Sequence, residues 1–265
     1  MSTSSSDLGE AVLFIHSTGT FPMMWSAVPA EAIGGRTAIS PANLGYPPHP
    51  AIARGEKVTV DDEVAHVLAA VPTDVTKLHV VAHSYGGTVA LAAIEQLGPR
   101  LASMFLAEPV LFGALRHDTE TDPAIVEEAR AFVSSPLLDE EKGGRLEWLE
   151  AFIDYWNRPG AWARLPEPMR EHSLAMGWKM YQEVRACFGA EKPFDQYVID
   201  VPTTLAIGER TTAHSRAMTT ALARRRPNVV IAEMSKTGHM APLTHPALVA
   251  AEIAKHFSRL EGRSA

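Results

Sequence analysis

The sequence predicts an α/β fold, a doubly wound and mainly parallel sheet of about six strands, interrupted by one helical insertion. Two observations support this prediction. Short apolar runs alternate with longer helical stretches along most of the chain, which is the pattern of parallel β-α-β units. Residues 113–195 contain no convincing strand, yet a strand pattern resumes after them. This segment is therefore expected to be an insertion into the sheet domain and not an independent domain.

Apolar runs mark the six expected strands, at residues 11–15, 37–40, 78–82, 101–107, 203–207 and 228–234. Helices are expected between these strands, at residues 60–72, 88–97, 213–226 and 246–260. Three more helices are expected in the insertion, at roughly 123–134, 144–157 and 167–188. The helix at 60–72 begins with Asp61 and Asp62, whose carboxylates suit the positive end of a helix dipole. We assign residues 1–112 and 196–265 to one α/β core and residues 113–195 to the insertion.

Composition and charge exclude several classes of protein. The 265 residues are 46% hydrophobic and 21% charged, which is ordinary for a soluble globular protein. The formal net charge of −7 argues against broad electrostatic binding to nucleic acid or to an anionic membrane. The only cysteine, Cys187, excludes an internal disulfide and a cysteine-rich zinc site. We find neither a dinucleotide-binding glycine loop nor a cluster of metal ligands, so we expect no cofactor and no metal.

The N-terminus and the longest apolar runs bear on location and partners. The first ten residues lack the basic and apolar regions of a signal peptide. Apolar runs such as residues 11–15 are far shorter than the ~20 residues that a membrane helix needs. We therefore expect a cytoplasmic protein, a monomer or a homodimer, whose partner is a small-molecule substrate, with no nucleic-acid or membrane partner.

The chemistry is expected at the carboxyl ends of the strands, where doubly wound sheets bind their ligands. The strand at 78–82 leads directly into the sequence AHSYGG at 82–87, and a helix follows. A nucleophilic serine on a sharp strand-to-helix turn needs small residues two positions before and after it, and Ala82 and Gly86 meet this need. We interpret Ser84 as a nucleophile. A phosphate-binding turn is the alternative, but no lysine or arginine occurs between residues 78 and 99.

A nucleophilic serine needs a base and a site that stabilises the oxyanion. His239 follows the last expected strand and precedes the final helix, which makes it the candidate base, the alternative being an exposed loop histidine. Two backbone N–H groups should face the developing charge. Tyr85, directly after Ser84, is one candidate donor, and Thr18, in the loop after the first strand, is the other. The alternative for this loop is a simple glycine-containing turn.

The order of these motifs resembles the α/β-hydrolase superfamily over nearly the whole chain. The resemblance rests on FIHSTGT at 14–20, AHSYGG at 82–87, GER at 208–210 and GH at 238–239. It implies Ser84 as nucleophile, His239 as base, and Thr18 and Tyr85 as oxyanion donors. It also implies that residues 113–195 form a helical cap over the site.

Three features depart from the family pattern. Only about ten residues precede the first loop, so we expect a shorter, essentially all-parallel sheet. The His-Gly pair of this loop is replaced by His16-Ser17, whose extra hydroxymethyl group could crowd the loop or donate a further hydrogen bond. The Gly-x-x-Asp pattern after the penultimate strand is replaced by GERT at 208–211, and Thr211 cannot carry the charge of the usual acid.

The acid that orients His239 must therefore come from elsewhere. Glu108 ends the strand next to the Ser84 turn, a position where some α/β-hydrolases carry their acid, and we favour it. Glu209 has the same strand parity as Thr211 and could also face the site. Structural alternatives are an anchor for the insertion at Glu108 and a surface ion pair at Glu209, and a third possibility is that no working acid exists.

The expected activity is that of a serine hydrolase which cleaves a small, mostly apolar carboxylic ester or lactone through an acyl-enzyme. C–C bond hydrolysis or acyl transfer with the same serine and histidine is an alternative, and so is a non-catalytic ligand-binding protein on a decayed hydrolase scaffold. Candidate pocket residues are His16, Ser17, Trp156, Trp162 and Trp178. We expect only one or two of these tryptophans at the site, because aromatic residues at helical spacing more often fill a core.

Overall fold

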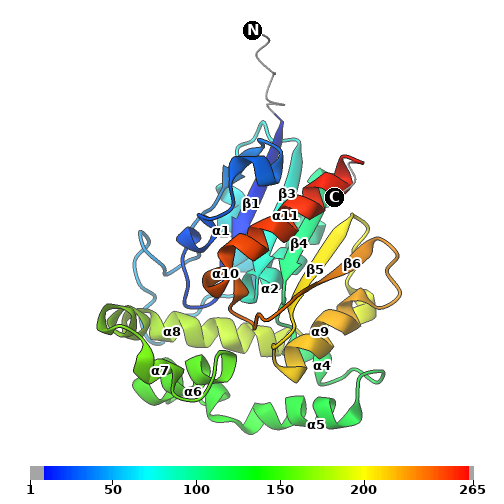
Figure 1. Ribbon diagram of the computed structural model, residues 1–265. Coiled ribbons are helices and arrows are strands. Elements are labelled where there is room, and N and C mark those ends of the chain that lie inside the picture. Colours follow the sequence, from blue (N-terminus) through cyan, green and yellow to red (C-terminus); the bar gives the residue numbers. More distant parts are fainter. Residues whose placement is uncertain (1–8, 263–265) are drawn as a thin grey trace.

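A single parallel sheet of six strands forms the centre of the molecule (Figure 1). The computed structural model describes residues 9–262. The strands are β1 (Glu10–Ile15), β2 (Thr37–Ile39), β3 (Lys77–His83), β4 (Leu101–Ala107), β5 (Thr203–Gly208) and β6 (Val229–Met234). They lie in the order β2-β1-β3-β4-β5-β6, and every neighbouring pair is parallel. The predicted fold class is confirmed. The expectation that the N-terminus is not a signal peptide rests mainly on residues 1–8, which lie outside the described residues.

Both faces of strands β1, β3, β4 and β5 are buried, because their side chains alternate between two apolar cores. In β1, Leu13 and Ile15 face one core, and Val12 and Phe14 face the other. Helices α1 (Val60–Ala69) and α2 (Tyr85–Ala92) cover the first face. Helix α11 (Pro246–Leu260) covers the second face together with the short 3-10 helices η1 (Pro22–Trp25) and η2 (Ala30–Ile33). Figure 1 shows α11 in front of the strands and α1 and α2 behind them.

Local sequence signals explain where α1 and α2 begin. The Thr59 hydroxyl accepts a hydrogen bond from the Asp62 N–H, and the Asp62 carboxylate accepts one from the Thr59 N–H, which together make a capping box. Helix α2 begins at Tyr85, three residues before the expected start, directly after Ser84. A short helix α3 (Ile94–Leu97) and the 3-10 turn η3 (Gly98–Arg100) follow it. Ser84 therefore lies immediately before the positive end of a helix.

The described part of residues 113–195, assigned above to an insertion, contains helices and no strand. Its elements, from just before its expected start, are α4 (Phe112–Leu115), α5 (Pro123–Ala131), η4 (Phe132–Ser134), η5 (Pro136–Leu138), α6 (Leu146–Trp156), α7 (Ala161–Arg164), α8 (Glu167–Gly189) and η6 (Phe194–Gln196). Helices α5 to α8 lie beyond the carboxyl ends of the strands (Figure 1). Trp148 is buried in this segment, where its indole stacks on Phe152 and its Nε1–H donates to the Leu137 carbonyl over 2.9 Å. The segment shares one continuous apolar core with the first face of the sheet.

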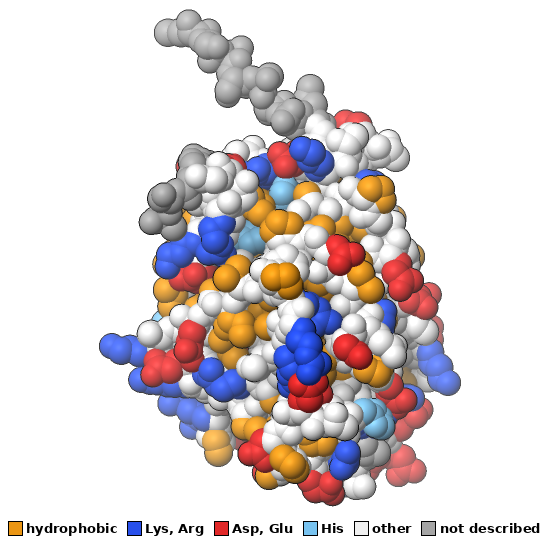
Figure 2. Space-filling view, turned by 90° about the vertical axis from the view of Figure 1, so that its right-hand side faces the viewer, with side chains coloured by type: hydrophobic (Ala, Val, Ile, Leu, Met, Phe, Trp, Pro, Cys, Tyr) orange, Lys and Arg blue, Asp and Glu red, His pale blue; other side chains and the backbone are white. Residues whose placement is uncertain are grey.

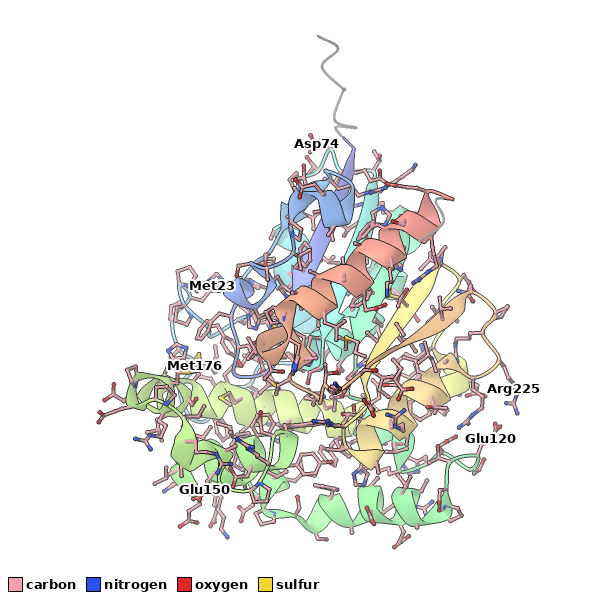
Figure 3. All side chains as sticks on the ribbon, viewed as in Figure 1. Met23, Asp74, Glu120, Glu150, Met176 and Arg225 are labelled. Carbon is pink, nitrogen blue, oxygen red and sulfur yellow. The ribbon has the colours of Figure 1, made fainter. Side chains whose placement is uncertain are left out.

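Two further helices complete the core, α9 (Ala213–Ala223) before β6 and α10 (Ala241–Thr244) before α11. The loop after α9 is joined to the start of the insertion by Arg225 and Glu120, which form two hydrogen bonds of 2.9 Å (Figure 3). This exposed pair adds little stability on its own. It joins the beginning of residues 113–195 to the core segment after α9.

The surface carries no large field of one sign on the side of the molecule where β6 lies. Figure 2 shows basic and acidic side chains interspersed over that side, with apolar side chains between them. Within residues 9–262, no helix combines the length and the apolar character that a membrane span requires.

Candidate active site

Ser84 lies in a strained turn between β3 and α2. Its backbone has φ 55° and ψ −120°, a combination that residues other than glycine rarely adopt. A Cβ atom at Gly86 would lie 2.6 Å from the Ile15 carbonyl oxygen and 2.7 Å from that of His16. The first strand and its loop therefore pass too close for any side chain at this position, which explains the need for a small residue two positions after the serine.

His239 lies in the loop after β6 and reaches Ser84 through its Nε2 atom, 3.0 Å from the serine Oγ. Its Nδ1 atom is 2.7 Å from Oε2 of Glu108. A carboxylate only accepts, so Nδ1 carries the ring proton and Nε2 is left to accept the serine hydroxyl. His83 supports this arrangement, because its Nε2–H donates to the His239 carbonyl over 2.9 Å. Burial lowers the pKa of His83 to about 3, so its ring is neutral.

Glu108 follows β4 directly, with a positive φ of 46°, and its side chain is buried. Its Oε2 atom accepts hydrogen bonds from Thr211 Oγ1 over 2.6 Å and Ser215 Oγ over 2.5 Å, besides that from His239. Its Oε1 atom accepts the Gly208 N–H over 2.8 Å. Burial by itself raises the pKa of Glu108, but the His239 and hydroxyl contacts outweigh burial and lower it to about 2. The carboxylate is therefore ionised.

Thr211 occupies the position of the aspartate in the Gly-x-x-Asp pattern expected from the resemblance, and its hydroxyl donates to the Glu108 carboxylate. Sequence reasoning missed this contact and that of Ser215, because it treated Thr211 only as a lost charge. Glu209, the other acid considered, is exposed, and its carboxylate accepts the backbone N–H of Lys236 over 2.7 Å. The structure thus brings Glu108, and not Glu209, to His239.

The loop after β1 holds Thr18 in one orientation. The Ser17 carbonyl accepts hydrogen bonds from His16 Nδ1 over 3.0 Å, from Thr20 Oγ1 over 2.8 Å and from the Thr20 N–H over 3.2 Å. In a trans peptide the N–H points away from the carbonyl of the same unit. Three donors that fix the Ser17 carbonyl therefore also fix the Thr18 N–H.

Thr18, Ser84 and Tyr85 line the same cavity. Tyr85 is the first residue of α2, so its N–H has no acceptor within the helix and belongs to the positive end of the helix dipole. The residues expected to stabilise an oxyanion thus line the cavity that Ser84 also lines.

Comparison with known proteins identifies the family to which the chain belongs. Residues 12–252 match the model of a family described as the alpha/beta hydrolase family. The chain belongs to the alpha/beta hydrolase family. A search of curated proteins found no match to this chain.

Solved structures share the fold of this alpha/beta hydrolase. One is a thermophilic esterase from Thermogutta terrifontis, with a TM-score of 0.63 and 21% identity over 95% of this chain and 90% of that one. Another is MenH from S. aureus, with a TM-score of 0.66 and 16% identity over 97% of this chain and 96% of that one. A third is an alpha/beta hydrolase enzyme from a Medee basin deep-sea metagenome library, with a TM-score of 0.71 and 13% identity over 100% and 93%. At these identities the likeness concerns the fold alone.

The cavity beside Ser84 of this alpha/beta hydrolase is small and mostly apolar. Its volume is about 20 Å³. Besides Thr18, Ser84 and Tyr85, its lining consists of Val110, Phe112, Phe132, Leu137, Phe152, Tyr155, Trp156, Val184, Cys187 and Phe188. Trp156 stacks on the His239 ring, with 3.9 Å between the ring centroids and an interplanar angle of 26°. Sequence analysis did not anticipate the phenylalanines, because their side chains converge only through the packing of α4, η4, α6 and α8.

Trp156 is the one tryptophan of the three candidates that the structure places at this cavity. Trp162 is buried elsewhere, and its backbone N–H donates to Asp154. The Trp178 indole donates to the Glu56 carbonyl over 2.9 Å and lies under Arg54, away from Ser84. We expected one or two of these tryptophans at the site, and Trp156 alone of the three lines this cavity. Trp162 and Trp178, which were also candidate pocket residues, do not line it.

His16 and Ser17 build the loop after β1 and do not line the cavity. The buried His16 ring accepts the Asn43 N–H at Nε2 over 2.9 Å, and burial lowers its pKa to about 3. The Ser17 hydroxyl lies 3.1 Å from Thr20 Oγ1. These two residues were expected at the substrate pocket, but they are not among those that line the cavity beside Ser84. The His16 ring is hydrogen-bonded to Ser17 and Asn43, and the Ser17 hydroxyl lies next to that of Thr20.

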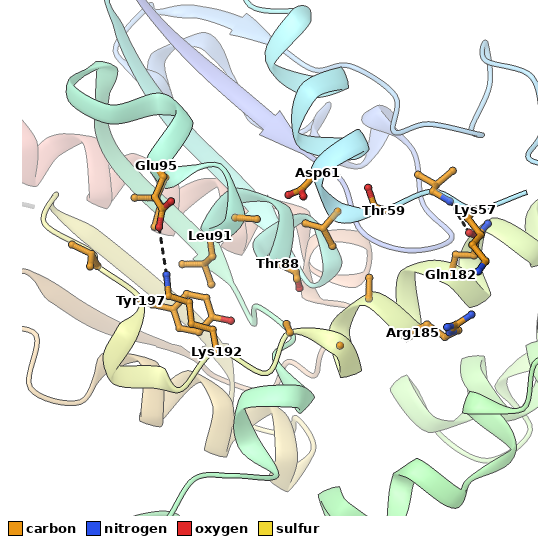
Figure 4. Close-up of a pocket in the computed structure, with 18 residues that line it drawn as sticks. Lys57, Thr59, Asp61, Thr88, Leu91, Glu95, Gln182, Arg185, Lys192 and Tyr197 are labelled. Atoms are coloured by element: carbon orange, nitrogen blue, oxygen red, sulfur yellow. Dashed lines mark hydrogen bonds and ion pairs between the residues drawn. The ribbon is translucent and has the colours of Figure 1, made fainter.

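A larger pocket, of about 550 Å³, lies between α1, α2, α3 and the C-terminal end of α8 (Figure 4). Its lining includes Thr88 and Leu91 together with the ion pair of Glu95 and Lys192. Ser84, His239 and Glu108 are not among its lining residues, so the larger of the two pockets is not the one beside the candidate catalytic residues. Within residues 9–262, no group of three or more histidine, cysteine, aspartate or glutamate side chains is arranged to hold a metal ion.

Proposed function

We propose that this alpha/beta hydrolase is a serine hydrolase that cleaves a small, mostly apolar carboxylic ester or lactone through an acyl-enzyme on Ser84. The observation that carries the proposal is the hydrogen-bonded chain from Ser84 Oγ to His239 Nε2, at 3.0 Å, and from His239 Nδ1 to Glu108 Oε2, at 2.7 Å. A serine hydroxyl on a neutral imidazole, itself oriented by an ionised carboxylate, is the arrangement that activates serine for attack.

Each residue then has one role in acylation. His239 Nε2 takes the hydroxyl proton as Ser84 Oγ attacks the carbonyl carbon, and Glu108 stabilises the imidazolium that forms. The N–H groups of Thr18 and Tyr85 donate to the oxyanion of the tetrahedral intermediate. When this intermediate collapses, the ester C–O bond breaks and the departing alcohol oxygen takes the proton from His239.

Deacylation repeats these roles with water. His239 removes a proton from a water molecule, whose oxygen attacks the acyl carbon of the ester on Ser84. Collapse of the second intermediate releases the carboxylic acid, and the proton on His239 returns to Ser84 Oγ. A lactone follows the same steps, except that the alcohol stays attached to the released acid.

The lining of the cavity supports the proposed substrate class. Ten of its side chains come from the apolar and aromatic set named above, so an apolar acyl or alcohol group would lose little hydration on binding. A cavity of about 20 Å³ is too small for an ester in the conformation described. We therefore also propose that residues 113–195 form a cap that shifts, with Trp156 at its inner surface, when substrate enters.

Two sequence features favour a non-catalytic protein, the missing acid at Thr211 and the His16-Ser17 pair, and the contacts around each of them argue against that alternative. Glu108 supplies the carboxylate that Thr211 lacks. His16 and Ser17 form an ordered loop that does not obstruct Ser84. Cys187 lines the same cavity, but burial raises its pKa to about 12, so it stays a thiol and does not compete as nucleophile.

Labelling with a fluorophosphonate, read by intact mass, tests the proposal. Wild type should gain one adduct, and Ser84→Ala should gain none. Ser173→Ala is a matched control, because this buried serine lies on α8 and donates only to the Met169 carbonyl. An adduct that persists in Ser84→Ala, or no adduct on folded wild type, would contradict the proposal. Product analysis on ester, lactone and diketone substrates, with and without an alcohol acceptor, then separates hydrolysis from C–C cleavage and acyl transfer.

A further inference from the structure

A second buried polar cluster lies behind the loop that carries Thr18. Lys179, on α8, places its Nζ atom 2.7 Å from Oε2 of Glu63, on α1, and 2.5 Å from Oε1 of Glu183, one turn further along α8. All three side chains are at most 1% exposed. The proposed acyl-transfer steps use none of them.

This cluster reaches both peptide segments that carry the proposed oxyanion donors. On one side, the Tyr46 hydroxyl donates to Oε2 of Glu183 over 2.8 Å and accepts the Gly19 N–H over 2.8 Å. Gly19 directly follows Thr18. On the other side, the Tyr85 hydroxyl lies 3.4 Å from Oε2 of Glu63, and Lys179 Nζ lies 5.2 Å from the centroid of the Tyr85 ring.

The direction of the Tyr46 hydroxyl depends on Glu183. A phenol has one proton, so a hydroxyl that donates to a carboxylate must turn its lone pairs elsewhere, here toward the Gly19 N–H. Lys179 holds Glu183 in place from the opposite side. Burial lowers the pKa of Lys179, but Glu183 and Glu63 more than offset this, so its pKa lies above the ordinary value and the ammonium stays charged.

Stability does not account for such a cluster. One ammonium and two carboxylates are removed from water together, and apolar replacements of buried ion groups are often neutral or stabilising. The charges do provide direction, because Lys179 holds Oε1 of Glu183, the Tyr46 hydroxyl donates to Oε2 of Glu183, and the same hydroxyl accepts the Gly19 N–H.

We propose that Lys179, Glu63 and Glu183 act through Tyr46 as positioning residues for the oxyanion hole. This inference rests on the proposed function. Lys179 and Glu183 belong to α8, within the proposed cap. The same contacts therefore link the position of the cap to the geometry of the loop that carries Thr18.

Tyr46→Phe is the sharpest test, because it removes one oxygen and keeps the ring that packs on His16. Tyr181→Phe is the matched control, since its hydroxyl donates to the Leu138 carbonyl, away from the loop. On p-nitrophenyl acetate, Tyr46→Phe should lower kcat by about tenfold or more, less than the ~10²–10³ for outright loss of a donor, with KM nearly unchanged. The inhibition constant of a trifluoromethyl ketone, which forms a tetrahedral adduct on the serine, should rise by the same factor. Tyr181→Phe should match wild type.

Two variants of Glu183 distinguish a change in the oxyanion hole from a general loss of stability. Glu183→Gln keeps an oxygen that can accept from Tyr46, so it should retain more activity than Glu183→Leu at a comparable melting temperature. An active, labelled wild type with equal kinetics in Tyr46→Phe and Tyr181→Phe would overturn this inference alone, as would equal kinetics in the two Glu183 variants. No adduct and no turnover in wild type would instead overturn the proposed function.

Discussion

Replacement of Glu108 by glutamine tests the assignment of the acid most directly. Three donors converge on Oε2 of Glu108, from His239, Thr211 and Ser215, while Oε1 accepts the Gly208 N–H. A glutamine amide has one oxygen and one NH₂ group. If the NH₂ group faces His239, it opposes the three donors that Oε2 accepts in wild type. If it faces the other way, it opposes the Gly208 N–H.

The expected loss of activity follows from either orientation of the amide. With its NH₂ group beside Nδ1, the amide favours the ring form that carries its proton on Nε2, which cannot accept the proton of Ser84. With its oxygen beside Nδ1, its NH₂ group opposes the Gly208 N–H, and the neutral amide no longer stabilises the imidazolium as the carboxylate does. In the serine-histidine-aspartate template, the equivalent change lowers kcat by ~10⁴, which corresponds to about 5.5 kcal/mol of transition-state stabilisation. We expect Glu108→Gln to lower kcat on p-nitrophenyl acetate by about 10³–10⁴ while the far-ultraviolet circular dichroism stays unchanged.

Two further variants make this result decisive. Glu209→Gln is the control, since Glu209 is exposed and has no contact with His239, and it should stay near wild-type activity. Thr211→Asp in the Glu108→Gln background should restore part of the activity, because Thr211 Oγ1 lies 2.6 Å from the oxygen that His239 contacts. A loss of less than about tenfold in folded Glu108→Gln would refute the assignment.

Three other predictions concern the cavity, pH and the serine turn. Trp156→Ala should enlarge the cavity beside His239 and raise the ratio of kcat/KM for p-nitrophenyl octanoate over acetate by about tenfold; an unchanged ratio would remove Trp156 from the pocket. Because the pKa of Glu108 is lowered from 4.5 to about 2, its stabilising contribution is complete above pH 4.5 and is lost as pH falls toward 2. The difference in melting temperature between wild type and Glu108→Gln should therefore shrink from about pH 6 to about pH 3, and a constant difference would argue against a paired carboxylate. Gly86→Ala would place a Cβ atom 2.6 Å from the Ile15 carbonyl oxygen, so it should lower kcat by about tenfold or more through displacement of the first loop, and wild-type kinetics would refute that reasoning.

Features encoded by neighbouring residues could be predicted from the chain. Strands β1, β3, β4 and β5 were recognisable because buried parallel strands are continuous apolar runs. The Ser84 turn was recognisable because strand, small residue, serine, small residue and helix follow one another without a gap. His239 was recognisable from its place after the last strand, since the carboxyl ends of parallel strands meet at one edge of the sheet.

The choice between the two acids required the tertiary structure. Glu108 and Glu209 follow neighbouring strands, so their order in the sequence leaves both near the site. The register of β4 on β5 and the positive φ of Glu108 turn its carboxylate toward His239, whereas Glu209 turns outward. A backbone angle of this kind is held by surrounding contacts and leaves no local pattern in the sequence.

The sequence by itself determined the fold class, the family resemblance, and the candidate serine and histidine, because each depends on local periodicity or on strand order. Only the tertiary structure decided which carboxylate meets His239, which tryptophan lines the cavity, and that Lys179 is buried between Glu63 and Glu183. These contacts join residues many positions apart in the chain. Their geometry depends on how helices pack across the sheet, and that packing is a property of the whole fold.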